Sequence, residues 1–215
     1  MKKFITSWFS IVGLTLMIAT TPATAQQLGG EYSILPSPVP SESKGKIEVV
    51  EFFSYACPHC NTFNPLLTEW AKQLPADVVF RKEAVQFTSP FYRLTARLFY
   101  ALEAMGEEER LNAAIFRAIH NEGVKLTDEK SATAWVATQG VDRKKFGAAF
   151  NSTGVIKQLE RSEKLVEEIN LPGVPALIVD GRYLVGGPEI KSFKQMLTVA
   201  DQLLAKARAE RDTKK

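Results

Sequence analysis

Two cysteines three positions apart, Cys57 and Cys60, are the residues whose type and spacing most clearly indicate chemistry. They are the only cysteines in the chain, and a bridge between them would close a very short loop that constrains little of the unfolded chain. Such a pair is poorly placed to stabilise a fold and well placed for reversible thiol-disulfide exchange. The sequence therefore predicts a redox-active disulfide, with no separate cofactor and no metal.

The residues around the pair predict how it is positioned. The run Ile47–Phe53 (IEVVEFF) is apolar, β-branched and aromatic, as in a buried strand, and a helical pattern begins at the cysteines. A cysteine at a helix N-terminus is stabilised as a thiolate by unpaired amide hydrogens and the helix dipole. We therefore expect Cys57 to be the accessible attacking thiol and Cys60, one turn later, to be the buried resolving thiol.

Three further residues are expected to assist. His59 can place a positive charge or a hydrogen bond near the Cys57 sulfur, which would lower its pKa, and Pro58 suits the first turn of a helix. Glu51 lies inside the apolar strand, where burial should raise its pKa and let it carry a proton for Cys60. Lys82, on the next predicted strand, is a possible charge partner. The alternative for Glu51 is a strand-edge carboxylate that faces water.

A second motif, Gly173-Val174-Pro175-Ala176, opens a predicted strand far along the chain. Together with the segment from Glu51 to Cys60, it resembles the DsbA family of bacterial thiol-disulfide oxidases, which have a thioredoxin fold. The resemblance implies that Val174 and Pro175 form a cis-proline loop within the substrate site, and that an acid at position 51 is functional. The chain departs from the family pattern at Asn64-Pro65, where some members carry acidic residues.

The rest of the chain fits an α/β, thioredoxin-like fold with an inserted all-helical domain. Helical apolar spacing fills the middle of the sequence, and Asp180-Gly181 predicts a tight hairpin turn between two late strands. The predicted segments are a signal peptide at 1–25, an extended arm at 26–46, thioredoxin-like parts at 47–88 and 170–209, the helical insertion at 89–169, and a solvated charged tail at 210–215.

The first 25 residues predict export. Lys2 and Lys3 precede an apolar stretch, and Ala23-Thr24-Ala25 is a typical cleavage pattern. Without those two lysines the chain has 25 basic and 24 acidic residues, a balance that argues against a nucleic-acid binder. We expect a periplasmic monomer. By resemblance, its partners are reduced, unfolded secreted polypeptides and a membrane quinone-linked oxidase of the DsbB type.

Three alternatives stay open at this point. A disulfide isomerase or reductase of the same superfamily would share the cysteine spacing, although Val174 and Pro58 favour the oxidase. A metal-binding module would need more ligands than the two cysteines, and only His59 and His120 are available as imidazoles. A peptide-binding chaperone without redox activity would not depend on Cys57.

Overall fold

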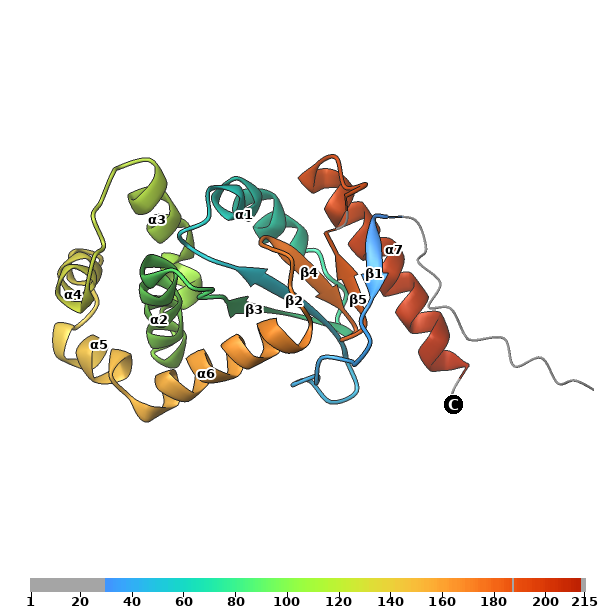
Figure 1. The fold of residues 1–215 in the computed structure, drawn as a ribbon, viewed down its shortest axis with the longest axis horizontal. Helices are drawn as coiled ribbons and strands as arrows, with labels where there is room; N and C mark the ends of the chain where they lie inside the picture. Colours follow the sequence, from blue (N-terminus) through green and yellow to red (C-terminus); the bar gives the residue numbers. More distant parts are fainter. Residues whose placement is uncertain (1–29, 187, 214–215) are drawn as a thin grey trace, which may run out of the picture.

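The computed structural model describes residues 30–186 and 188–213. Within them, five strands form one sheet in the order β1-β5-β4-β2-β3 (Figure 1). β2 and β3 are parallel, and the other neighbouring pairs are antiparallel. The strands are β1 Tyr32–Ile34, β2 Ile47–Phe53, β3 Val78–Ala84, β4 Ala176–Val179 and β5 Tyr183–Val185.

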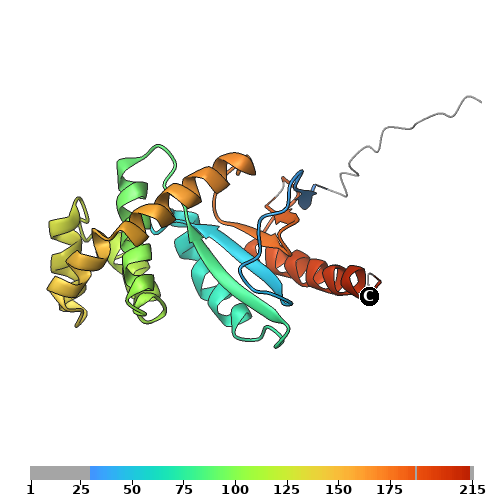
Figure 2. The same ribbon diagram turned by 90° about the horizontal axis from the view of Figure 1, so that it is seen from below.

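Helices account for most of the remaining described chain. Helix α1 follows β2, α7 follows β5, and five helices lie between β3 and β4, where the sequence predicts a helical insertion. Figures 1 and 2 show α2 to α5 as a lobe beside the sheet, with α6 running back toward it. The helices are α1 Pro58–Ala71, α2 Pro90–Ala104, α3 Glu108–His120, α4 Glu129–Thr138, α5 Arg143–Phe150, α6 Thr153–Glu168 and α7 Phe193–Asp212. The α/β class with a helical insertion is thus confirmed.

The central strand β2 is buried along its whole length, with side chains alternating between the two faces of the sheet. Val49 shares a core with residues of α1 and α7, whereas Val50 and Phe52 pack with Leu165 of α6. Burial on both faces explains why the strand reads as a nearly continuous apolar run. At the end of the strand, Phe53 joins the core of the helical lobe, so the two parts meet beside the cysteines.

The hairpin between β4 and β5 forms at Asp180 and Gly181, as the sequence predicts. Both residues have positive φ angles, 54° and 66°, which is the conformation of a type I′ turn. A Cβ atom at Gly181 would also collide with the carbonyl oxygen of Val39, which lies against the turn. Glycine is therefore required at this position by both conformation and space.

The predicted N-terminal leader, residues 1–25, lies outside the described residues. The part of the arm that is described includes β1, which forms one edge of the sheet. Beyond β1, the amide of Leu35 donates to the carbonyl oxygen of Arg182 and that of Val39 donates to the carbonyl oxygen of Gly181, so the arm runs along the turn between β4 and β5. In the described part of the chain, no helix combines the length and the apolar character needed to cross a membrane.

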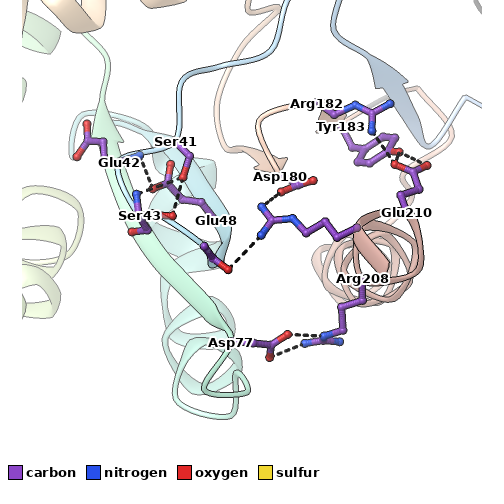
Figure 3. A network of polar contacts seen from close by, with 12 residues as sticks. Ser41, Glu42, Ser43, Glu48, Asp77, Asp180, Arg182, Tyr183, Arg208 and Glu210 are labelled. Atoms are coloured by element: carbon purple, nitrogen blue, oxygen red, sulfur yellow. Dashed lines mark hydrogen bonds and ion pairs between the residues drawn. The ribbon is translucent and has the colours of Figure 1, made fainter. Parts of the chain in front are cut away.

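The prediction of a frayed tail from residue 210 is wrong for residues 210–212, because α7 continues to Asp212. Figure 3 shows why: the charged side chains of its last turns reach back to the hairpin and to the loop before β3. Glu210 accepts from the Tyr183 hydroxyl, Arg211 pairs with Asp180, and Arg208 forms an ion pair with Asp77. Side-chain partners, rather than solvent, stabilise this end of the helix.

Candidate active site

Cys57 is the N-cap residue of α1, four positions after Phe53 at the end of β2. Its sulfur accepts a hydrogen bond from the backbone N–H of Cys60 at 3.4 Å, and Pro58 occupies the first helical turn, where no N–H is needed. The turn before it is closed by Ser54, whose carbonyl oxygen accepts from the Cys57 amide at 3.0 Å. The connection from β2 to α1 therefore places Cys57 at the N-terminus of α1, which is the positive end of the helix dipole.

The two thiols are free in this structure and differ slightly in exposure. Cys57 is 4% exposed and Cys60 is 0% exposed. Cys57 is thus more enclosed than the sequence suggests, because the Val174 loop and Tyr92 of the helical lobe lie against its sulfur. Pro58 and His59, by contrast, are exposed beside it.

The environment separates the acidities of the two thiols. A hydrogen bond from the Cys60 thiol is the largest influence on Cys57; together with the backbone N–H groups of Cys60 and His59, it outweighs burial and lowers the pKa of Cys57 to about 6. Burial and the neighbouring Cys57 sulfur raise the pKa of Cys60. The positive charge of His59 also lowers the pKa of Cys57, but it is the smallest of these influences. The N–H groups at the start of α1 and the charge of His59 act in the direction that the sequence suggests, and the influence of the Cys60 thiol is added to theirs.

The Val174-Pro175 loop lies against the cysteine pair, although 117 positions separate Val174 from Cys57. The Cys57 thiol donates to the carbonyl oxygen of Val174 over 3.5 Å. The peptide bond between Val174 and Pro175 is cis, and the chain enters β4 at Ala176. The sequence motif and the redox motif thus meet at one site.

A cavity of about 610 Å³ opens next to this loop. Its walls are mainly apolar, and Phe193 in its wall stacks on Phe63 of α1 with 4.9 Å between ring centroids. The cavity connects the start of α1, the Val174 loop and the start of α7. Its lining residues are His59, Val174, Pro175, Gly186, Ile190, Lys191, Ser192, Phe193 and Met196.

Glu51 is buried in the middle of β2, with 2% of its surface exposed. Burial is the main reason that its pKa rises to about 7, while the positive charge of Lys82 opposes the rise. The expected pairing of Lys82 with Glu51 is not found: the Lys82 Nζ lies 2.7 Å from Oε1 of Glu108 on α3. The reading of Glu51 as a water-facing carboxylate is therefore wrong. Lys82 acts on Glu51 through its charge, but it forms its ion pair with Glu108.

Asn64 and Pro65, where the sequence departs from the family pattern, lie in α1 and face different constraints. Asn64 is buried, and its Oδ1 accepts a hydrogen bond from Nδ2 of Asn112 on α3 at 2.6 Å. Pro65 lies inside α1 and cannot donate a backbone hydrogen bond there. At Asn64, α1 thus makes a neutral contact with α3.

The structure also brings two residues to the site for which the sequence predicts no role in the redox chemistry. Tyr92 on α2 lies near the cysteine pair, and burial together with the charges of Cys57 and Cys60 raises the pKa of Tyr92. His120 at the end of α3 has its Nε2 2.8 Å from the carbonyl oxygen of Tyr55, just before the pair. Both belong to the helical lobe, and no local motif marks either of them.

Comparison with known proteins places these features in a family. A family model described as a DSBA-like thioredoxin domain matches residues 92–198. The thiol:disulfide interchange protein DsbA of Bordetella parapertussis is 38% identical over 208 residues, which span 94% of this chain and 98% of that protein. The protein of the same name from Pseudomonas aeruginosa is 40% identical over 186 residues, 84% of this chain and 85% of that protein.

Solved structures agree. The crystal structure of Pseudomonas aeruginosa DsbA matches with a TM-score of 0.81 and 38% identity, covering 86% of this chain and 95% of that one. Oxidoreductase DsbA from Xylella fastidiosa matches with a TM-score of 0.79 and 31% identity, covering 86% of this chain and all of that one. Similarity over nearly the whole length, combined with a redox pair at the start of α1, shows that the chain belongs to the DsbA family of thiol-disulfide oxidoreductases.

Proposed function

We propose that the protein is a periplasmic oxidase that donates its Cys57–Cys60 disulfide to reduced, unfolded polypeptides after their export. The observation that carries this proposal is the difference between the two thiols: the pKa of Cys57 falls to about 6, while that of Cys60 rises. An environment that stabilises the Cys57 thiolate stabilises the reduced enzyme. The disulfide is then a strong electron acceptor.

The reaction proceeds in two exchanges. A substrate thiolate attacks the Cys57 sulfur, the Cys57–Cys60 bond breaks, and its electron pair leaves on Cys60, which takes a proton. A second thiolate of the substrate then attacks the substrate sulfur of the mixed disulfide and releases Cys57 as a thiolate. Two substrate thiols become one disulfide, and the enzyme pair gains the two electrons. The low pKa of Cys57 makes it a good leaving group in the second exchange.

Glu51 is the proposed proton carrier for Cys60. The Cys60 sulfur is fully buried and cannot leave as a stable thiolate, so a proton must reach it from a nearby acid. The charge of Glu51 acts on Cys60, and a pKa of about 7 leaves Glu51 able to donate and accept at neutral pH. The same group would accept the Cys60 proton when the pair is reoxidised.

The substrate is proposed to bind as an extended chain between the Val174 loop and the apolar cavity. The backbone of Val174 already faces the reacting sulfur, and the cavity beside it offers apolar surface from Ile190, Phe193 and Met196. Backbone contacts at the loop would hold many sequences, and apolar side chains exposed by unfolded proteins would enter the cavity. By family, a DsbB-type membrane oxidase returns the pair to the disulfide form, and the protein acts as a monomer.

A single-turnover experiment tests this function. Oxidised protein is mixed with an equimolar reduced, unfolded polypeptide that carries two cysteines, and thiols are trapped with acid over time. We expect the substrate to become oxidised while Cys57 and Cys60 become reduced, with a transient mixed disulfide at Cys57. Transfer in the opposite direction would identify a reductase. Function that survives Cys57→Ser would indicate a chaperone, and stoichiometric zinc in the purified protein would indicate a metal module.

A further inference from the structure

Glu51 and Lys82 are direct neighbours in the parallel pairing of β2 and β3. Adjacent strands lie about 4.8 Å apart, so an ion pair between these two residues would be the simple arrangement. No such pair is present, although both residues belong to the described part of the chain. The Lys82 ammonium instead contacts Glu108 at 2.7 Å, with only 15% and 19% of the two side chains exposed. A third residue, Glu108 of helix α3, therefore forms the ion pair with Lys82 that Glu51 could have formed.

Helix α3 is fixed in the position that this contact requires. Asn112 lies one turn after Glu108 on the same face of α3 and donates to Asn64 of α1 at 2.6 Å. The hydrogen bond is buried and connects α3 to the helix that begins at the redox pair. Lys82, Glu108 and Asn112 all line one recess of about 450 Å³ between α1, β3, α2 and α3.

We propose that Glu108 is a positioning residue for the redox reaction: it holds the Lys82 ammonium away from the Glu51 carboxylate, so that Glu51 remains able to donate and accept a proton. This proposal rests on the proposed role of Glu51 as the proton carrier for Cys60. Glu108 touches neither cysteine in the structure and acts through Lys82. An ammonium paired with Glu51 would instead favour the ionised carboxylate and prevent it from donating a proton.

The charged and titratable groups around Glu51 agree with this arrangement. Lys82 on β3 lowers its pKa, whereas Glu108 on α3 and Cys57 at the start of α1 raise it. Cys60 and Tyr55 are the other titratable groups whose acidity Glu51 affects. On its other side in the sheet, Glu51 is paired with the uncharged Leu177 of β4. Besides burial and the nearby Cys57, the pKa of Glu51 is therefore set by the opposing charges of Lys82 and Glu108.

The experiment measures how fast Cys60 resolves a mixed disulfide at Cys57 as pH varies. Reduced protein is mixed with excess oxidised glutathione and quenched with acid, and the mixed-disulfide and oxidised forms are separated by mass. Because resolution needs Glu51 to accept the Cys60 proton, its rate should rise with pH around a midpoint near 7. In Glu108→Gln the midpoint should fall by about one pH unit, since Lys82 can then approach Glu51. An unchanged or higher midpoint would overturn the proposal.

Glu109→Gln is the matched control, because it removes the same charge from the next, exposed residue of the same recess. Its midpoint should match that of the unaltered protein; an equal fall in both variants would mean that overall charge, not positioning, is responsible. Lys82→Met should raise the midpoint, and in that background Glu108→Gln should lose at least half of its effect. A full effect without Lys82 would show that Glu108 acts directly, which contradicts the proposal.

Glu51→Gln distinguishes a failure of the role proposed for Glu51 from a failure of the role proposed for Glu108. If the pH midpoint near 7 persists in Glu51→Gln, Glu51 is not the proton carrier, and the role proposed for it fails together with the inference. If the midpoint disappears in Glu51→Gln but Glu108→Gln leaves it unchanged, only the role of Glu108 fails. The expected result is loss of the midpoint in the first variant and a downward shift in the second.

Discussion

The backbone N–H of Cys60 donates to the sulfur of Cys57 at 3.4 Å, so each cysteine shapes the acidity of the other within one helical turn. The Cys60 side chain is also the largest influence that lowers the pKa of Cys57. The reduced pair therefore holds its negative charge on Cys57 and its proton on Cys60. The reactivity of the site follows from this division.

The hydrogen bond from the Cys60 thiol should matter more for the acidity of Cys57 than the charge of His59 does, because it is the largest influence on that pKa and His59 is the smallest. The rate at which iodoacetamide modifies Cys57 should have its midpoint near pH 6 in the unaltered protein. In Cys60→Ala the midpoint should rise by about one pH unit or more, and in His59→Ser by less. A larger rise in His59→Ser would reverse the assigned order.

The reduced protein should gain stability over the oxidised form as pH rises. The folded pKa of Cys57 is lowered to about 6, so its contribution is complete above the unfolded value and is lost as pH falls through 6. Between pH 6 and 8 the difference in free energy of unfolding, reduced minus oxidised, should increase by about 2 kcal/mol. Urea denaturation of both forms at several pH values measures it. A difference that does not change with pH would show that the Cys57 thiolate does not stabilise the reduced protein.

Glu51→Gln should stabilise the protein at high pH. The folded pKa of Glu51 is raised to about 7, so the protonated group is favourable below its unfolded pKa and that advantage is lost as pH rises through 7. Relative to Glu51→Gln, the unaltered oxidised protein should lose roughly 3 kcal/mol of unfolding free energy between pH 4 and 9. Glu69→Gln, on the exposed side of α1, should show no such loss. Parallel curves for Glu51→Gln and the unaltered protein would contradict the raised pKa.

The apolar cavity should affect polypeptide substrates and spare small ones. Ile190→Ser removes apolar surface from its wall, and oxidation of a reduced, unfolded polypeptide at limiting concentration should slow about fivefold. Reaction with glutathione, which is too small to span the cavity and the Val174 loop, should keep its rate. Leu66→Ser is the matched control, since Leu66 is an exposed apolar residue outside the cavity. Equal effects on both substrates would exclude the cavity as a binding surface.

Much of this architecture can be predicted from the sequence because its signals are local. The strand before Cys57, the helix that begins at the pair and the Asp180-Gly181 turn each depend on a few adjacent residues. The link between Cys57 and Val174 is not local, and it was predicted only because the motif around Pro175 resembles that of a known family.

What the sequence could not provide are contacts between distant elements. Lys82 has two carboxylates within reach of its strand, and only the packing of α3 determines that it pairs with Glu108. The sequence predicts that the charged residues at the end of α7 are solvated. In the structure, however, Glu210 and Arg211 contact side chains of the β4–β5 hairpin. Tyr92 likewise reaches Cys57 only because the helical lobe folds back over the end of β2.

The most direct test of the central claim is a redox titration of the Cys57–Cys60 pair against glutathione at pH 7. Stabilisation of the Cys57 thiolate predicts an oxidising pair, so the protein should remain largely reduced even where oxidised glutathione exceeds the reduced form. A pair that is mostly oxidised in buffers dominated by reduced glutathione would have a reducing, thioredoxin-like potential. That result would contradict the oxidase function.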